Sequence, residues 1–308
     1  MPEPSEAEAM AMMDQLSNWG RWGPDDRNGT LNFVTSDVQR RALAVPQAGR
    51  CISLARGISP TDWEDMAPRT LRFMVVSGER ADQAGQSVAA EWFGLPTHGY
   101  STTHLDSLGH VFWKSKMYNG LDASEVDQLE GARRGSIEDA GDGIMTRAVL
   151  LDLPSTLGVD YLPNGYRIRP DELEAAERQA GITLGSGDAL LFRTGRDVDR
   201  QARGPFRPWE TGSAGLSAAC MPWIHEREVS LLGSDGTQDP YPHLYPNFES
   251  VVHVVGIVAM GLWILDNCYL ENLVAASVER GSYEFQLVIS PLKLEGATGS
   301  PVNPMAIL

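Results

Sequence analysis

The apolar segment Arg147–Leu153 constrains the fold most, because five of its seven residues are apolar and predict a strand. A helix is predicted for Ile168–Gly181, since Pro170 suits its first turn and Gly181 suits its end. Asp188–Arg193 predicts another strand. A strand, a helix and a strand in succession indicate an α/β fold.

Further strands and helices are predicted along the chain without a regular βαβ alternation. The strands are Cys51–Leu54, Arg72–Val76, Glu91–Gly99 (strand and turn), Val229–Gly233, Leu262–Asp266 and Glu284–Leu292, and the helices are Ser36–Ala44, Ser250–Gly261 and Leu270–Val278. The chain has 308 residues and no internal repeat or low-complexity linker. We therefore expect one α/β domain over residues 18–308, preceded by an acidic N-terminal arm at residues 1–17.

The composition disfavours two classes of binding partner and predicts the cellular compartment. The formal net charge of −16 disfavours nucleic acids and anionic membranes. The acidic segment Met1–Met13 lacks the basic start and apolar stretch of a secretory signal, and the longest apolar run, Val251–Leu265, is too short to span a bilayer. These features predict a cytoplasmic protein. Cys51, Cys220 and Cys268 are too scattered for a disulfide framework or a thiolate zinc site, so we expect buried packing residues.

The closely spaced pair His104 and Asp106 is the strongest chemical signal. On a helix, side chains two residues apart point about 200° apart, whereas on a strand they share one face. The β-branched Thr102 and Thr103 just upstream favour a strand. We therefore expect the imidazole and the carboxylate to converge as metal ligands. Hydrogen-bonded histidines around a capping aspartate are the alternative.

His110 follows Gly109, which predicts a turn that returns this imidazole toward the same centre. A histidine beside a metal-bound water is suited to act as general base or acid. A second polar cluster spans residues 233–243, where Gln238 offers a neutral oxygen ligand and Asp235 and Asp239 are expected to cap turns. The other three histidines, His98, His225 and His243, receive no role.

Residues 100–110 resemble the signature His-x-Gly-Thr-His-x-Asp-x-Pro-x-His of the cyclase-family metal hydrolases, which include bacterial kynurenine formamidase and isatin hydrolase. Thr103, His104, Asp106 and His110 match it. Other segments resemble the family in the same order along the chain, at residues 49–54, 233–235, 253, 264–267 and 291–304. The resemblance implies a swivelling β/β/α domain with a central barrel-like mixed sheet.

Two departures make isatin hydrolase the closer member. Formamidase-like members hold two zinc ions with the first His of the signature and a late Glu, where this chain has Tyr100 and Asp266. The resemblance therefore implies one divalent metal ion per subunit, Mn²⁺ or Zn²⁺, held by His104, Asp106 and Gln238.

The implied activity is hydrolysis of a cyclic amide, amide or lactone carbonyl by a metal-activated water, with His110 as the general base. Tyr100, Trp92 and Trp63 are candidates for binding a small aromatic or cyclic substrate. Ser250 and His253 are candidates for a proton relay, with helix capping and core packing as the alternative.

Two other functions stay possible on the same residues. A cyclase or dehydratase reaction on the same scaffold, or a non-catalytic metal- or ligand-binding protein, would use the same residues. A serine hydrolase is disfavoured because no Gly-x-Ser-x-Gly elbow is present, and a nucleotide cofactor because no phosphate-binding glycine motif is present. Family members are usually homodimers or homotetramers, so we expect a homo-oligomer.

Overall fold

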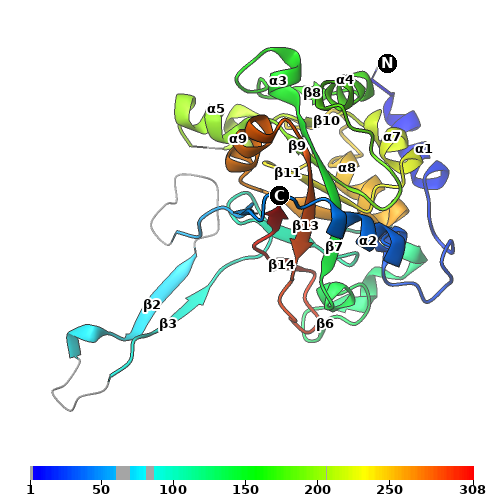
Figure 1. The fold of residues 1–308 in the computed structure, drawn as a ribbon. Helices are drawn as coiled ribbons and strands as arrows, with labels where there is room; N and C mark the ends of the chain where they lie inside the picture. The colour runs from blue at the N-terminus through cyan, green and yellow to red at the C-terminus, as the bar shows by residue number, and fades with distance from the viewer. Residues whose placement is uncertain (1–2, 60–69, 81–86, 206) are drawn as a thin grey trace.

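A nine-stranded mixed sheet forms the centre of the protein (Figure 1). The computed structural model describes residues 3–59, 70–80, 87–205 and 207–308. Four parallel strands lie side by side in the middle of the sheet: β7 (Ile144–Asp152), β9 (Ala189–Arg193), β11 (Leu231–Ser234) and β12 (Trp263–Asp266). The predicted α/β fold with a central mixed sheet is confirmed.

Antiparallel strands extend the sheet on both sides. Beside β7 lie β13 (Glu284–Ile289), β15 (Met305–Ile307) and β1 (Cys51–Ser53), and beside β12 lie β4 (His104–Asp106) and β14 (Gly299–Pro301). The adjacent strands β12, β4 and β14 therefore bring together residues from three distant parts of the sequence.

Both faces of the central strands are buried, which explains why their sequences are nearly continuous apolar runs. In β7, Val149 and Leu151 pack into one core cluster, whereas Ala148 and Leu150 pack into the other. The first cluster is covered by helices α1 (Glu6–Gln15), α4 (Pro170–Ala180) and α7 (Cys220–Glu226), and the second includes side chains of α9 (Glu271–Arg280). The residues of α1 thus belong to the core, while the division into an arm and a domain stays a prediction.

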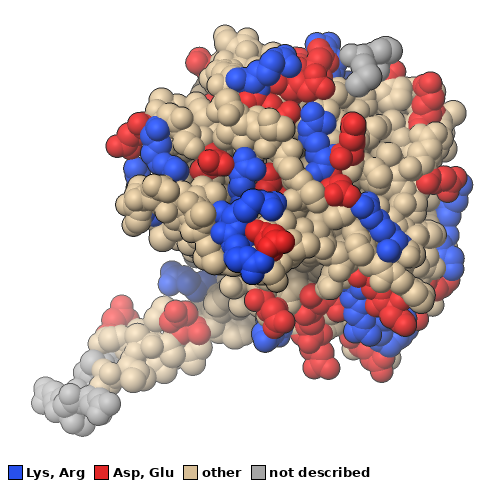
Figure 2. Space-filling view, turned by 45° about the vertical axis from the view of Figure 1, so that its right-hand side comes forward, with Lys and Arg blue, Asp and Glu red and all other residues tan. Residues whose placement is uncertain are grey.

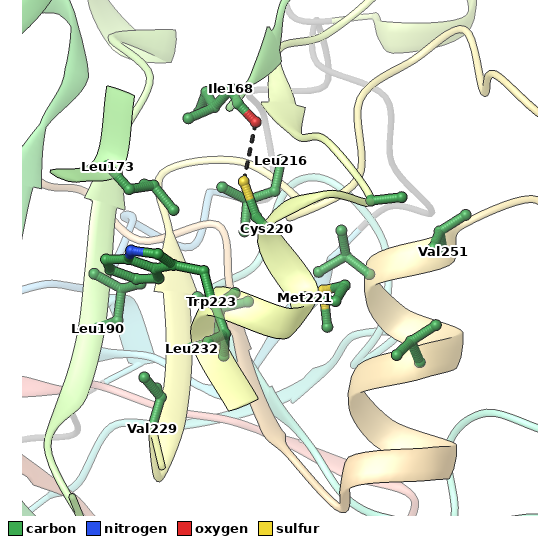
Figure 3. Close-up of a cluster of buried hydrophobic side chains, with 14 of the residues drawn as sticks. Ile168, Leu173, Leu190, Leu216, Cys220, Met221, Trp223, Val229, Leu232 and Val251 are labelled. Atoms are coloured by element: carbon green, nitrogen blue, oxygen red, sulfur yellow. Dashed lines mark hydrogen bonds between the residues drawn. The ribbon is translucent and has the colours of Figure 1, made fainter. Parts of the chain in front are cut away.

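Helix α7 lies between the sheet and helix α8 (Val251–His253). It places Cys220, Met221 and Trp223 among apolar neighbours (Figure 3). The Cys220 thiol donates a hydrogen bond to the Ile168 carbonyl, and burial raises its pKa well above the ordinary value. Cys220 and Cys268 are the buried packing residues that the sequence predicted, but Cys51 is exposed, which corrects the prediction for that residue.

A hairpin of β2 (Leu71–Val76) and β3 (Ala90–Gly94) projects from the body (Figures 1 and 2). Its strands are mostly apolar yet exposed, because no second layer of the described structure packs against them. Phe73 is 58% exposed and Trp92 is 52% exposed, and their rings stack on each other. Trp92 therefore lies on a projecting surface.

The predicted helix at Ser250–Gly261 is present but irregular. A short α-helix, α8 (Val251–His253), continues as a π-helical segment, η6 (Val254–Met260), that ends at Gly261 in the left-handed conformation. Its start is fixed by Asp239, whose carboxylate accepts hydrogen bonds from the backbone N–H groups of Val252 (2.8 Å) and His253 (3.1 Å). The expected capping role of Asp239 is thus observed, and π-helical turns often mark functional sites.

The remaining elements connect these layers. They are α2 (Ser36–Ala44), α3 (Leu153–Leu157), α5 (Arg196–Arg203), α6 (Pro208–Thr211), the short strand pairs β5 (Val126–Asp127) with β6 (Gly131–Ala132) and β8 (Arg167–Ile168) with β10 (Gly215–Leu216), and the 3₁₀ turns η1 (Gly29–Phe33), η2 (Gly78–Arg80), η3 (Tyr118–Gly120), η4 (Ala123–Glu125) and η5 (Ile137–Ala140). Among the helices of the described ranges, none has the length and apolarity needed to cross a membrane.

Candidate metal and catalytic site

His104 and Asp106 lie on strand β4 and point to the same side, as the spacing of two predicted. Both side chains are almost completely buried, and His104 Nε2 is 3.4 Å from Asp106 Oδ1. The His104 ring donates from Nδ1 to the Thr102 carbonyl at 2.8 Å, so its Nε2 lone pair faces the carboxylate. A backbone acceptor on one ring nitrogen is the usual way in which proteins orient a metal-binding histidine.

Asp266 joins this pair from the neighbouring strand. It lies opposite His104 in the antiparallel register of β12 and β4, and its Oδ2 is 3.8 Å from His104 Nε2. The ligand atoms of His104, Asp106 and Asp266 all lie within 4.8 Å of one another. Asp266 was not predicted as a site residue: the expected strand Leu262–Asp266 ends on it, but only the register of β12 and β4 brings it beside His104.

His253 approaches the same carboxylates from helix α8. Its Nδ1 donates to Asp239 Oδ2 at 2.6 Å, while its Nε2 is 3.7 Å from Asp106 Oδ2 and 3.6 Å from Asp266 Oδ2. Burial opposes a charge on this ring, but the hydrogen bonds and negative charges of Asp239 and Asp266 outweigh burial and raise the pKa of His253 well above its ordinary value. His253 is thus both a helix residue and part of the polar cluster.

His110 reaches the cluster through the predicted turn. Its backbone N–H donates to the Ser107 carbonyl, and a Cβ atom at Gly109 would lie only 2.8 Å from the Gly135 carbonyl oxygen, so this close approach requires glycine. His110 Nε2 is 4.0 Å from Asp106 Oδ2. Burial lowers the pKa of His110 to about 4 against the attraction of Asp106, so the imidazole is neutral at pH 7.

His98 is the residue that the sequence analysis missed most clearly. Its Nδ1 is 2.8 Å from Asp106 Oδ1, and its ring stacks on that of His110 with centroids 3.6 Å apart. His98 therefore lies inside the site, which corrects the expectation of a histidine without a role. No local pattern signals this position, because the segment before β4 is irregular.

The four histidines of the cluster, together with Asp239 and Asp266, form part of the wall of a pocket of about 420 Å³. Its described lining comprises His98, Gly99, Tyr100, His104, His110, Val111, Phe112, Ser213, Thr237, Asp239, Tyr241, His243, Ser250, His253 and Asp266. This volume lies in the range of small-molecule sites. The lining includes His243, which had received no role from the sequence.

Tyr100 and Ser250 also line this pocket, as expected of residues near substrate. Burial, followed by the charges of Asp266 and Asp239, raises the pKa of Tyr100. Trp92 lies on the projecting hairpin and is not among the described lining residues, so its role in substrate binding stays a prediction. Trp63 lies outside the described residues.

Gln238 is completely buried beside the same strands. Its Nε2 donates to the Leu265 carbonyl at 3.1 Å, and Leu265 lies opposite Leu105, the residue between His104 and Asp106. Within the described residues, Gln238 Oε1, Asp106 Oδ2 and Asp266 Oδ1 are buried acceptors without a hydrogen-bond donor. Buried acceptors of this kind are costly unless a donor or a cation compensates them, so the donor set fits a divalent metal ion.

Asp106 is ionised in this setting. Burial alone would raise its pKa, but the neighbouring imidazoles of His110 and His104 and the hydrogen bond from His98 hold the pKa of Asp106 well below its ordinary value. An anionic carboxylate between neutral or cationic imidazoles is the state in which it can bind a cation.

A buried polar network holds the chain segment that carries Tyr100. Asn267 has φ of 58°, in the left-handed region, and donates from Nδ2 to the Gly99 carbonyl at 2.7 Å. Arg196 donates to Asn267 Oδ1 at 2.6 Å. Asp235 in turn accepts from Thr194 N and Oγ1, Gly195 N and Arg196 N at 2.8–3.0 Å, which is the predicted capping role of Asp235 at the start of α5.

Comparison with known proteins agrees with this geometry. The profile of the family "Putative cyclase" matches residues 46–238, more than half of the chain. A crystal structure described as a novel cyclase is similar with a TM-score of 0.86 at 28% identity, covering 96% of this chain and 99% of that chain. No curated protein sequence matches.

Isatin hydrolases share the fold at lower identity. Isatin hydrolase A from Labrenzia aggregata, solved with benzyl benzoate, has a TM-score of 0.61 at 18% identity over 83% of this chain and 93% of its own. Isatin hydrolase A from Ralstonia solanacearum has a TM-score of 0.56 at 20% identity over 83% and 91%. Together with the match to the family profile, the shared architecture settles the classification: the chain belongs to the cyclase family.

Proposed function

We propose that this protein is a metal-dependent hydrolase that cleaves an amide, cyclic amide or lactone carbonyl in a small aromatic or cyclic substrate. The observation that carries the proposal is the buried cluster of His104, Asp106 and Asp266 at the wall of an open pocket, with carboxylate oxygens that lack a hydrogen-bond donor in the described structure. Two buried carboxylates close together are stabilised by a cation.

His104 and Asp106 are the proposed primary ligands of one divalent ion, Mn²⁺ or Zn²⁺. Gln238 and Asp266 are proposed to complete the set, since each has an unpartnered oxygen in the described structure. When bound, such an ion polarises a carbonyl and lowers the pKa of water. Mixed nitrogen and oxygen ligands suit either metal.

His110 is proposed as the general base. Its neutral imidazole lines the pocket beside Asp106 and can accept a proton from the attacking water. Tyr100 is proposed to donate a hydrogen bond to the substrate, because it lines the pocket and its raised pKa keeps its phenol protonated. Ser250 and His253 are proposed to pass protons between the pocket and Asp239, to which His253 is hydrogen-bonded.

The test is a hydrolysis assay of the metal-loaded protein on a panel of lactams, amides and lactones. We expect release of a carboxylic acid that stops after chelation and recovers with Mn²⁺ or Zn²⁺. His110→Asn is expected to abolish turnover while metal remains bound. His225→Asn is the matched control, because His225 lies on α7 outside the described pocket lining.

The family description favours a second candidate, a cyclase or dehydratase reaction in the same pocket. It would be indicated by loss of water from a hydroxy acid without hydrolysis of any panel member. Metal binding with no turnover of either kind, and full retention of ligand binding in His110→Asn, would indicate a binding protein instead.

A further inference from the structure

His98 contacts three residues of the proposed site with one ring. It hydrogen-bonds to Asp106, stacks on His110 at an interplanar angle of 3°, and packs edge-to-face on His104 with centroids 5.3 Å apart. The ring thus lies against a proposed metal-binding carboxylate, a proposed metal-binding imidazole and the proposed base. The signature residues of the sequence assign it no role.

Both ring nitrogens of His98 are engaged by the protein. An ionised carboxylate only accepts hydrogen bonds, so Nδ1 donates to Asp106 Oδ1 at 2.8 Å. Nε2 lies 3.1 Å from Thr298 Oγ1. His104 differs, because among the described residues only its Nδ1 has a hydrogen-bond partner, and its Nε2 faces the two carboxylates.

The distance from the ring nitrogen to Asp106 Oδ1 distinguishes a metal-binding histidine from a hydrogen-bonding one. Ligand atoms about 2.1 Å from one ion, at angles of roughly 90–110°, are roughly 3.0–3.4 Å apart. The separation of 3.4 Å between His104 Nε2 and Asp106 Oδ1 agrees with a shared ion. The separation of 2.8 Å between His98 Nδ1 and Asp106 Oδ1 is that of a direct hydrogen bond.

The neighbouring strand leaves room for this ring. Gly299 on β14 lies opposite Asp106 in the antiparallel register, and a Cβ atom there would lie 2.7 Å from His98 Cε1. It would also lie 2.8 Å from the Leu105 carbonyl oxygen. A side chain at this position would therefore displace either the imidazole or the strand that carries His104 and Asp106.

We propose that His98 is a positioning residue, which orients the Asp106 carboxylate through Nδ1 and the His110 imidazole through ring stacking, and that it is not a metal ligand. The proposal rests on the metal site and general base proposed above. Through its hydrogen bond to Oδ1, His98 directs Asp106 Oδ2 toward His110 and His253. The Nε2 atoms of these two rings lie 4.0 and 3.7 Å from Oδ2. Partners that orient metal ligands typically contribute roughly 10–100-fold to metal affinity or activity.

The test compares His98→Ala with His98→Asn, because the shorter amide retains a donor for Asp106 but loses the stack on His110. Manganese titration by calorimetry is expected to give one ion per chain in wild type and in both variants. The affinity is expected to fall roughly 10–100-fold in His98→Ala and less in His98→Asn. Thr298→Val, which removes the partner of Nε2, is expected to have a smaller effect of the same kind.

Two further measurements distinguish a positioning role of His98 from a role as metal ligand, and one of them does not depend on the proposed reaction. In turnover assays, both variants are expected to lower kcat more than they raise KM, because the base is misplaced. In the metal-free protein, His98→Ala is expected to shift the ring resonances of His110 in NMR spectra, because the stacked ring is lost. This last measurement needs neither metal nor substrate, so it tests His98 even where hydrolysis is not found.

Several outcomes overturn the proposal. Two ions per wild-type chain and one in His98→Ala would make His98 a ligand. Unchanged His110 resonances, or unchanged metal affinity and kcat in a folded His98→Ala protein, would remove its positioning role. Absence of turnover in wild type, with the expected metal and NMR effects intact, would refute the proposed reaction and leave the placement of His98 standing.

Discussion

Asp266 faces His104 across two antiparallel strands, and its carboxylate is also 3.6 Å from the imidazole of His253. This register gives the site a second carboxylate that the local motif around His104 does not contain. Two carboxylates, Asp106 and Asp266, are thereby buried within reach of the same imidazole. Their mutual repulsion in the metal-free protein and their joint attraction for a cation lead to the first prediction.

Asp266→Asn is expected to have opposite effects on the metal-free and metal-loaded proteins. Removing one of two buried like charges stabilises the metal-free fold, whereas losing an anionic ligand weakens Mn²⁺ binding by more than roughly 100-fold. Thermal unfolding with and without Mn²⁺ measures both effects. Wild type at 100-fold excess over its Kd should gain about 2.7 kcal/mol from the metal. An equal metal-dependent gain in Asp266→Asn would contradict this role.

The side chain of Gln238 offers a second test of the ligand set. Gln238→Leu removes the buried amide with little change in volume and is expected to lower Mn²⁺ affinity roughly 10-fold. Gln238→Glu is the paired variant, and its added charge is expected to strengthen metal binding and to destabilise the metal-free protein. Calorimetric titration distinguishes the cases, and identical affinities in all three proteins would exclude Gln238 as a ligand.

The pH dependence of turnover tests His110. A histidine whose pKa is lowered to about 4 is neutral, and competent as a base, at every pH above about 5. Its activity is lost only as pH falls through about 4, and a nearby cation would shift the loss further toward acid. We therefore expect kcat/KM between pH 5 and 8 to lack a limb near pH 6.5. A limb near pH 6.5 in the wild-type profile would contradict the shift.

The polar network below Tyr100 predicts a large stability effect. Asp235 accepts four hydrogen bonds at the start of α5, two of them from the backbone N–H groups of Gly195 and Arg196. Asp235→Asn replaces one accepting oxygen by an N–H₂ group that faces donors, and is expected to cost about 3 kcal/mol of unfolding free energy. Asp37→Asn, at an exposed carboxylate of α2, is the control, and equal denaturation midpoints for the two variants would contradict the prediction.

The projecting hairpin predicts where copies of the chain meet. Phe73 and Trp92 form an exposed apolar pair on strands that do not contribute to the described core clusters. We expect the double substitution Phe73→Lys and Trp92→Lys to convert the expected homo-oligomer into monomers without lowering the melting temperature. Light scattering after size exclusion measures the mass. Leu129→Lys, at an isolated side chain that is 97% exposed, is the control, and an unchanged mass in the double variant would exclude this interface.

The sequence predicted those parts of the fold and site that depend on local spacing. The convergence of His104 and Asp106 follows from strand geometry, and the helix Pro170–Ala180 follows from its proline start and glycine end. The metal-ligand assignments and the catalytic role of His110 stay predictions. Asp266 and His98 could not be found in this way, because they meet Asp106 only through the register of β12, β4 and β14 or through an irregular segment.

Other departures have the same physical origin. The sequences of β2 and β3 are mostly apolar, like those of buried strands, and do not indicate that both strands are exposed in the described structure. The switch from α- to π-helical geometry after His253 has no signal in the apolar run Val254–Met260, because every residue of that run is apolar or glycine and buried.

The position of β4 between β12 and β14 also sets the order in which the site can form during synthesis. The strand with His104 and Asp106 is synthesised long before Asp266, and Gly299 follows later still. Pairing over such sequence separations is slow, because the entropy of closing the intervening loop is lost first. A nascent chain that has not yet reached β12 therefore lacks the strand pairing that brings Asp266 beside His104.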